Sequence, residues 1–556
     1  MLTYSILLFI PEIFLIGKVS MPVYLLALGF NLLFYLSFSY VICFIGQLCG
    51  RNVGKAWHAV WHILIYFLSI SNVFLYVFFG LCWDAFTITL MNETNDSEVS
   101  GFVSTYFTSA RFYFLIFLYI LIAAAEVFCL RRATDKELKL GKMKWIAIPT
   151  LIIMLCQVFF FSTDYEQNYL MAKGTPIKRN MLWKLEQSVL MFQENQKDFT
   201  VCAKSIENAT VDSCAYRSPN IIIIIGEAYI KRHSSLYGYG KETNPLLSKE
   251  DNLYVFNDVI APYNNTSESF KNFLSMTSMD DSIKWCEAPL FPALFRKAGY
   301  YVTFYSNQFV KGGAEESRFD AKAGFFSHPA IEPNIIDSRN SERYPYDGEL
   351  ISQYVKDHQQ KDTIPYHLTF FHLYGQHVKA KDRYPKEFEH FHASDYPERT
   401  DLNESQRQEV AEYDNATRYN DYIVHEIINL FREQDAIVIY FSDHGDEAND
   451  YRPQLGRSYD FDKMGSKGIH CQYDIPFVIY VTDSYKQHHP EIVQEIISST
   501  DRRFMTDDLP HLVLYLAGID CRWYQPQRNL ISPDFKTDRQ RHISAGFDYD
   551  EFCRLH

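Results

Sequence analysis

The chain has 556 residues, a formal net charge of −14 at pH 7 and a mean hydropathy of −0.17. Its length exceeds what one ordinary hydrophobic core holds, so we expect two or more domains. The acidic balance argues against nucleic-acid binding, which requires a basic face. The first third of the chain is apolar and aromatic, whereas the remainder is mixed and charged.

Five hydrophobic segments precede residue 165, and each is a candidate membrane span. They cover residues 3–17, 21–46, 59–83, 111–130 and 144–161, and the first and last are near the lower limit of about 17 residues. No basic start precedes the first segment and further spans follow it, which disfavours a cleavable signal peptide. We therefore predict an α-helical transmembrane domain of five helices over residues 1–162.

The charges of the short loops predict the orientation of these spans. Arg51 and Lys55 separate the second segment from the third, and a basic stretch at 131–144 separates the fourth from the fifth. The loop 84–109 is acidic and contains no Lys or Arg. Basic loops remain in the cytoplasm. The N-terminus is therefore predicted inside, and the chain after residue 162 outside, which in a bacterium with two membranes is the periplasm.

Residues 163–215 form the predicted connection to the next domain. Apolar residues at 181–192 have helical spacing with charges between them, which fits an amphipathic helix at the membrane surface or a bridging helix packed on the next domain. Six of the eleven cysteines follow the apolar third, and an even number in an exported domain indicates disulfides. We expect Cys202 to pair with Cys214, because the two bracket a short polar excursion.

Strands and helices alternate over the predicted domain 216–556. The β-branched run at 221–225 is typical of a strand buried on both faces of a parallel sheet. Further strands are predicted at 301–305, 367–371, 436–441 and 476–480, with a helix at 409–433. This pattern predicts a doubly wound α/β domain whose active site lies at the carboxyl ends of the strands.

Acidic and histidine side chains stand at the ends of these predicted strands. They are Glu227, His372, His377, Asp443, His444 and His470. A single histidine at a strand end is more often a hydrogen-bonded structural residue, but several together with carboxylates suit zinc, which takes oxygen and nitrogen ligands in a tetrahedral shell. The sequence therefore predicts a metal site at this edge of the sheet.

Several ordered motifs resemble those of the bacterial phosphoethanolamine transferases. They are Gly226-Glu227 with Ser235-Leu236-Tyr237-Gly238-Tyr239 and Thr243-Asn244-Pro245, His372-x-x-Gly375-x-His377 with Arg383-Tyr384-Pro385, Tyr413-Asp414-Asn415-Ala416, and Ser442-Asp443-His444-Gly445-Asp446. Members of that family combine five spans and an interfacial linker with an alkaline-phosphatase/sulfatase-like α/β domain, whose central sheet is largely parallel. The resemblance covers nearly the whole chain.

The resemblance also implies roles for individual residues. Glu227, Asp443 and His444 would hold the principal zinc, and His377 and His470 a second zinc or the donor phosphate. His372 would contact the phosphoryl group or protonate a leaving oxygen. Family members also contact substrate at positions that match Asn265, Thr266, Lys311 and His372.

The reaction implied by the resemblance moves phosphoethanolamine from phosphatidylethanolamine to a cell-envelope acceptor such as lipid A or a glycan. The protein would be a monomer in the bacterial inner membrane, in contact with membrane lipids and with its catalytic domain in the periplasm. One or two zinc ions would serve as cofactor, and no nucleic acid would be a partner.

Position 228 departs from the expected pattern, because the family nucleophile, Thr or Ser, is expected directly after Glu227. Ala228 stands there, and its methyl group can neither attack phosphorus nor ligate a metal. Three interpretations remain open: an engineered Ser/Thr→Ala change, a natural relative that is inactive or uses metal-bound water, and a neighbouring hydroxyl that takes over.

Two other functions compete with this interpretation. A phosphoglycerol transferase of the lipoteichoic acid synthase type shares the spans and the sulfatase-like domain, and Ala228 is also compatible with a non-catalytic sensor of lipid head groups. Sulfatase activity is disfavoured, since no Cys/Ser-x-Pro-x-Arg segment follows Glu227.

Overall fold

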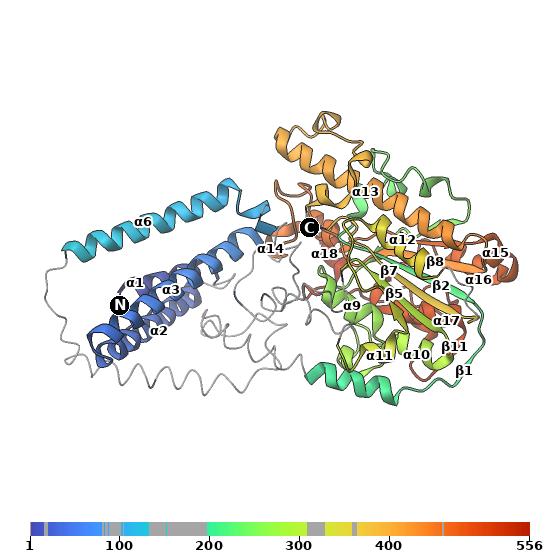
Figure 1. The fold of residues 1–556 in the computed structure, drawn as a ribbon, viewed down its shortest axis with the longest axis horizontal. Helices are drawn as coiled ribbons and strands as arrows, with labels where there is room; N and C mark the ends of the chain where they lie inside the picture. Colours follow the sequence, from blue (N-terminus) through green and yellow to red (C-terminus); the bar gives the residue numbers. More distant parts are fainter. Residues whose placement is uncertain are drawn as a thin grey trace. The chain divides into compact units, whose positions relative to one another are not determined.

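The computed structural model describes residues 2–15, 21–79, 83, 87, 102–103, 105–132, 152, 197–308, 328–358, 364–377, 379–458 and 461–555. These residues fall into two compact units. One unit contains the N-terminal apolar helices, and the other contains almost everything from residue 195 onward. Each unit is described by itself below (Figure 1).

The N-terminal unit contains α1 (Leu2–Leu15), α2 (Met21–Leu48), α3 (Arg51–Phe79) and α6 (Ala110–Arg132). Three stretches of the described helices are long and apolar enough to cross a membrane, namely Asn31–Leu48, Arg51–Phe79 and Ala110–Cys129. They correspond to the second, third and fourth predicted segments. The first predicted segment is the 14-residue α1, which is short for a span. The predicted segments 144–161 and 181–192 lie outside the described residues, apart from residue 152.

Small and polar side chains join the first three helices. Ser5 Oγ donates to Ser39 Oγ at 3.0 Å, and Trp57 Nε1 donates to the carbonyl of Ile42 at 2.8 Å. A Cβ on Gly54 would lie 2.2 Å from the carbonyl oxygen of Gly46, so α2 and α3 approach more closely than a side chain at position 54 permits. Close approach at glycine and hydrogen bonds between helices are typical of membrane helix packing.

The second unit is built on a seven-stranded sheet in the order β3-β9-β8-β2-β7-β5-β6. Its strands are β2 (Asn220–Gly226), β3 (Leu253–Val255), β5 (Tyr301–Ser306), β6 (Ser338–Arg339), β7 (His367–His372), β8 (Ala436–Ser442) and β9 (Phe477–Val481). The five strands from β8 to β6 are mutually parallel, whereas β9 is antiparallel to both β8 and β3. The predicted largely parallel sheet is therefore confirmed, and the predicted strand at 476–480 is its antiparallel member.

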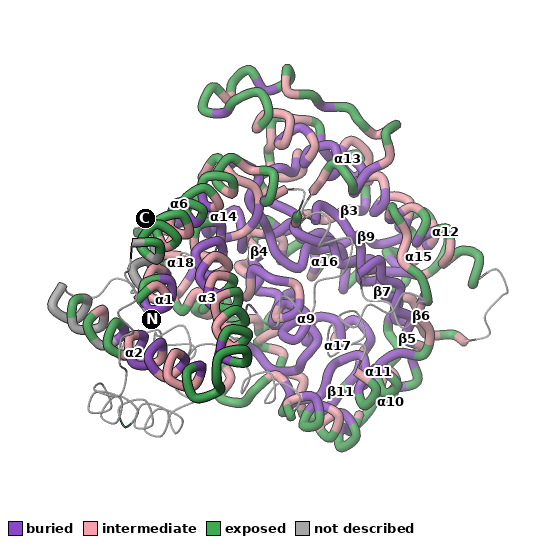
Figure 2. The backbone as a smooth tube through the Cα atoms, turned by 60° about the vertical axis from the view of Figure 1, so that its left-hand side comes forward, coloured by how far each residue is buried: buried purple, intermediate pink, exposed green. Residues whose placement is uncertain are grey.

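The five consecutive isoleucines of β2 point alternately to the two faces of the sheet, and each face is covered by one hydrophobic layer. Ile221, Ile223 and Ile225 join the layer that includes α9 (Thr266–Leu274), α10 (Phe291–Ala298) and α17 (Leu509–Ala517). Ile222 and Ile224 join the layer that includes α12 (Asp347–Asp357) and α13 (Glu404–Phe431). Figure 2 shows the strands buried between these helices. Burial on both faces explains the unbroken apolar run in the sequence.

Shorter elements complete this unit. They are β1 (Ser213–Cys214) paired with β11 (Ile519–Asp520), β4 (Val259–Ile260) paired with β10 (Phe504–Met505), α11 (Glu332–Ile335), α14 (Phe461–Tyr473), α15 (Asp483–His488), α16 (Pro490–Ser498) and α18 (Tyr549–Leu555). The unit also includes a helix at 197–208, so it begins on the N-terminal side of the predicted boundary at 216.

The predicted pairing of Cys202 with Cys214 is absent, and both residues are free thiols. Cys202 is fully buried in the larger hydrophobic layer, on the helix whose Ser205 hydroxyl donates to the carbonyl of Ala288. Cys214 instead lies in β1, where its thiol faces the carbonyl of Ala517 at 3.7 Å. The polar segment between the two cysteines connects a helix to a strand, and it does not bring the two thiols together.

Candidate metal centre

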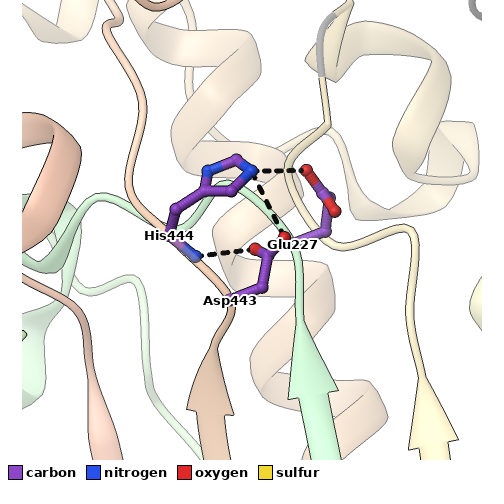
Figure 3. Close-up of side chains that lie close together, drawn as sticks. All are labelled: Glu227, Asp443 and His444. Atoms are coloured by element: carbon purple, nitrogen blue, oxygen red, sulfur yellow. Dashed lines mark hydrogen bonds and ion pairs between the residues drawn. The ribbon is translucent and has the colours of Figure 1, made fainter. Parts of the chain in front are cut away.

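Two neighbouring parallel strands bring the central acidic and histidine residues together. Glu227 follows β2, and Asp443 with His444 follows β8; the strands pair in register up to Gly226 and Ser442. One potential ligand atom from each of Glu227, Asp443 and His444 lies within 4.8 Å of the others, and all three residues are buried (Figure 3). The predicted set of principal ligands therefore converges at the carboxyl edge of the sheet.

The separations within this cluster match a tetrahedral metal shell. His444 Nε2 lies 3.2 Å from Asp443 Oδ2 and 3.4 Å from Glu227 Oε1. Zinc bonds of about 2.0–2.2 Å to nitrogen and oxygen separate tetrahedral ligand atoms by about 3.4 Å. The three atoms therefore fit the edges of such a shell.

The imidazole of His444 has the tautomer that a metal ligand needs. Its Nδ1 lies 2.7 Å from the carbonyl oxygen of Gly445, which fixes Nδ1 as the protonated nitrogen. The lone pair of Nε2 consequently points to the two carboxylates. Burial and the positive charge of Arg457 lower the pKa of His444, so the imidazole is neutral.

The two carboxylates leave oxygen atoms for a cation. Oε1 of Glu227 and Oδ2 of Asp443 are buried and accept no hydrogen bond from the part of the chain that the structure describes. Burial, and then the neighbouring Glu227, raise the pKa of Asp443 well above its usual range. Two adjacent buried carboxylates are unfavourable unless a positive charge compensates them. The donor set therefore fits a divalent metal such as zinc.

A hydroxyl group reaches this cluster from a helix rather than from a strand end. Thr266 is the first residue of α9, and its Oγ lies 3.0 Å from Glu227 Oε2 and 3.3 Å from His444 Nε2. Asn265 precedes it and caps α9, because its side chain accepts a hydrogen bond from the backbone of Glu268 at 3.1 Å. Two residues predicted as substrate contacts thus have separate positions: Asn265 caps the helix, and Thr266 lies against Glu227 and His444.

Ala228 contributes its backbone to the centre. Its φ of 58° is in the left-handed region, where a β-branched threonine would be strained. Its amide donates to Asp443 Oδ1 at 3.2 Å, and its carbonyl accepts from the Tyr413 hydroxyl at 2.6 Å. This conformation explains a small residue at position 228, and the hydroxyl that lies against the cluster belongs to Thr266.

Two of the predicted histidines do not join the cluster of converging ligand atoms. His372 ends β7 inside the layer under α9, where its ring packs on Phe270 and its Nδ1 lies 3.0 Å from Ser306 Oγ. Burial lowers the pKa of His372 to about 3, which keeps it neutral. His470 lies in α14 with Nδ1 near Asp474 and the hydroxyl of Tyr549, and hydrogen bonding to Asp474 contributes most to raising its pKa to about 9.

His377 lies nearer to the centre, and its loop contacts Glu227. The amide of Gln376 donates to the carbonyl of Glu227 at 3.0 Å. Gly375 has a φ of 50°, and a Cβ there would lie 2.9 Å from the backbone of Glu227. The remaining predicted residue, Lys311, lies outside the described residues.

Comparison with known proteins places this centre in a family. A family model described as Sulfatase matches residues 219–519, which span the sheet, the three converging ligands and Thr266. The chain belongs to the sulfatase family.

The curated relatives that align with most of this chain are named phosphoethanolamine transferases. Phosphoethanolamine transferase EptC of Escherichia coli (strain K12) is 24% identical over 493 residues, which are 86% of this chain and 82% of EptC. The C-terminal periplasmic domain of EcEptC from Escherichia coli, solved in complex with Zn, is 27% identical with a TM-score of 0.50, over 62% of this chain and 95% of the domain.

A full-length membrane protein shares the overall fold. The lipooligosaccharide phosphoethanolamine transferase A (EptA) of Neisseria meningitidis matches with a TM-score of 0.61 over 95% of both chains, at 16% identity. At this identity the likeness concerns the fold alone, and it covers the N-terminal helices as well as the sulfatase-family domain.

Two further residues of this sulfatase-family site were absent from the sequence prediction. Gln308 follows β5, and its Nε2 donates to Glu227 Oε2 at 3.0 Å and to the carbonyl of Leu373 at 2.9 Å. Arg457 places Nη1 2.5 Å from His444 Nε2. The position of Gln308 just after a predicted strand could have indicated it, whereas Arg457 lies in an irregular loop that carries no such signal.

Proposed function

We propose that this chain is a zinc-dependent phosphoethanolamine transferase. It takes phosphoethanolamine from phosphatidylethanolamine and passes it to a cell-envelope acceptor such as lipid A or a glycan. The observation that carries the proposal is the Thr266 hydroxyl, which lies against a buried set of two carboxylates and one imidazole. The names of the relatives supply the transferred group, and the zinc complex of the EcEptC domain supplies the metal.

Thr266 is the nucleophile in this proposal, in place of the residue expected at position 228. Zinc held by Glu227, Asp443 and His444 would lower the pKa of a hydroxyl beside it. Thr266 Oγ then attacks the phosphorus, and the bond between phosphorus and the diacylglycerol oxygen breaks. Glu227 Oε2 already accepts the hydrogen bond from Oγ and so is placed to take its proton, which ends on the departing diacylglycerol. The oxygen of the acceptor hydroxyl or phosphate later attacks the same phosphorus, the bond between phosphorus and Thr266 Oγ breaks, and Oγ regains a proton through Glu227.

The other predicted residues receive narrower roles. We assign His377 to the donor phosphate, because it lies close enough to His444 for a positive charge on it to lower the pKa of that imidazole. We assign His372 to the support of α9, because a neutral, fully buried ring packed on Phe270 cannot protonate a leaving oxygen. The contacts of His470 with Asp474 and Tyr549 favour a structural role, so we propose one principal zinc ion.

The proposed location is the bacterial inner membrane with the catalytic domain in the periplasm, as a monomer. Three apolar helices long enough to span a membrane support the anchor, and the basic loops support the orientation. The alternative of a non-catalytic lipid head-group sensor is less favoured in this proposal. It depended on the lack of a hydroxyl at position 228, and Thr266 supplies a hydroxyl beside the candidate ligands.

The test is a covalent intermediate on a defined peptide. The full-length protein in detergent micelles is mixed with zinc and labelled phosphatidylethanolamine, quenched and analysed by mass spectrometry. We expect one phosphoethanolamine increment on the peptide that contains Thr266. Thr266→Ala should abolish it, and Ala228→Thr should leave it where it is. An increment on another residue, or its persistence in Thr266→Ala, would refute the assignment.

A further inference from the structure

Arg457 links the two segments that build the metal centre. Its Nη1 lies 2.5 Å from His444 Nε2 and donates to the carbonyl of Asn264 at 3.1 Å. His444 follows β8, and Asn264 lies two residues before Thr266. The guanidinium therefore contacts a metal ligand on one side and the segment that leads to the hydroxyl on the other.

The contact with His444 uses the same lone pair that a metal would use. Nδ1 of His444 is committed to the carbonyl of Gly445, so Nε2 is the basic nitrogen. One lone pair accepts a hydrogen bond from a guanidinium or binds a metal ion, but it does not do both. Binding of zinc to Nε2 therefore requires Arg457 to release His444, while its contact with the Asn264 carbonyl can persist.

The charges of the loaded centre indicate where the released guanidinium goes. Glu227, Asp443 and a Thr266 alkoxide carry one more negative charge than zinc carries positive charge, and the phosphodiester of the donor adds another. Negative charge on phosphoryl oxygens is stabilised by arginine in transfer reactions, and the planar fork of a guanidinium matches these oxygens. Arg457 provides a positive charge beside the ligands and close to the hydroxyl that attacks.

We propose that Arg457 has two positions: on His444 when the metal is absent, and on the phosphoryl oxygens of the donor when zinc is bound. Arg457 thus competes weakly with the metal and binds the anionic substrate. This inference rests on the proposed function for the identity of the donor, and the anion site itself follows from the geometry and the charges.

The test measures zinc and anion binding separately on the full-length protein in detergent micelles. Zinc affinity is obtained by competition with a chromogenic chelator, and anion affinity by titration of the zinc-loaded protein with inorganic phosphate. For Arg457→Ala we expect zinc to bind about threefold tighter, because a competing cation is gone. We expect phosphate to bind about tenfold or more weaker, because charged hydrogen bonds are lost.

Two further variants provide controls. Arg457→Lys keeps the charge without the fork, so it should bind zinc as the unaltered chain does and phosphate with intermediate affinity. Arg418→Ala removes an arginine whose guanidinium contacts the carbonyl of Glu242 on the surface, and it should change neither affinity. Thermal unfolding of each variant checks that the fold is retained.

The direction of the two changes decides the outcome. If Arg457→Ala weakens zinc and phosphate together, or leaves both unchanged, the inference is overturned and Arg457 is structural. If the two affinities move in opposite directions while the unaltered chain forms no phosphoethanolamine adduct on Thr266, the anion site stands and the proposed transferase function fails.

Discussion

Thr266 and Glu227 are 39 residues apart in the sequence, yet the hydroxyl of Thr266 donates a 3.0 Å hydrogen bond to Oε2 of Glu227. The first turn of α9 therefore brings a hydroxyl group to a carboxylate at the end of β2. If this contact has the proposed catalytic role, the hydroxyl matters more than the shape of the side chain. Thr266→Ser should keep substantial transfer of labelled phosphoethanolamine. The nearly isosteric Thr266→Val should lose about a thousandfold or more.

The zinc content of these two variants serves as the control for the centre itself. Elemental analysis should find zinc in both, because the carboxylates and the imidazole remain. Comparable transfer by Thr266→Val and the unaltered chain would exclude Thr266 as the nucleophile.

The backbone of residue 228 leads to a prediction about stability. Alanine at a φ of 58° is already in a region that favours glycine, and a β-branched side chain increases the strain. Ala228→Thr should lower the free energy of unfolding by about 1–2 kcal/mol, whereas Ala228→Gly should be neutral or stabilising. The midpoints of thermal unfolding for the two variants test this. A more stable Ala228→Thr protein would show that residue 228 adopts another conformation.

The sequence predicted the part of the site that follows directly from the sheet. Apolar runs mark β2 and β8, so the sequence places Glu227, Asp443 and His444 at strand ends, and the family-like motifs singled these three out from the other strand-end histidines. Thr266 and Arg457 arrive through a helix start and an irregular loop, whose positions depend on contacts distant in sequence. Position 228 was predicted as the nucleophile position because it adjoins Glu227 along the chain, and its left-handed backbone conformation cannot be deduced from an alanine.

The direction of the His372 side chain could not be predicted from the sequence. This residue is the last of β7, and the alternation of side chains directs it into the layer beneath α9, beside Phe270. A shift of one residue would have directed it to the opposite face. The sequence shows where a strand ends only to within a residue or two, so it could not distinguish these orientations.

Gln308 should tune the affinity of the metal centre although it is not a ligand. Its amide holds Glu227 Oε2 at 3.0 Å and is itself held by the carbonyl of Leu373. Loss of a partner that orients a metal ligand typically costs tenfold to a hundredfold in affinity. Gln308→Leu should therefore bind zinc about tenfold or more weakly in a chelator competition. Gln353→Leu, on the exposed side of α12, should bind zinc normally. Equal affinities in both variants would contradict this role.

The orientation of the membrane anchor is tested with reporter fusions. The loop 84–109 is acidic and 131–144 is basic, so the chain after residue 162 should be exported. A reporter that is active only outside the cytoplasm should be active when fused after residue 165 and silent when fused within 131–144. The reverse pattern would place the metal centre on the cytoplasmic side.

A buried ion cluster beside the centre predicts how stability depends on pH. His233 lies 2.5 Å from Asp414 Oδ1 and 3.1 Å from Asp450 Oδ2. Burial opposes the charge of the imidazole, but the two carboxylates prevail and raise the pKa of His233 from 6.5 to about 10. Protonated His233 therefore stabilises the folded state by on the order of 1.4 kcal/mol for each unit by which its pKa is raised.

Because the folded pKa is the higher one, this stabilisation is complete below pH 6.5 and is lost as the pH rises toward about 10. His233→Asn lacks it at every pH. The difference in thermal midpoint between the unaltered chain and His233→Asn should thus be largest near pH 6 and shrink steadily up to pH 10. His488→Asn, which removes an exposed histidine bonded to Asp435, should show only a small difference, because solvent screens an exposed ion pair. A difference for His233→Asn that grows with pH would mean that His233 is neutral in the folded protein.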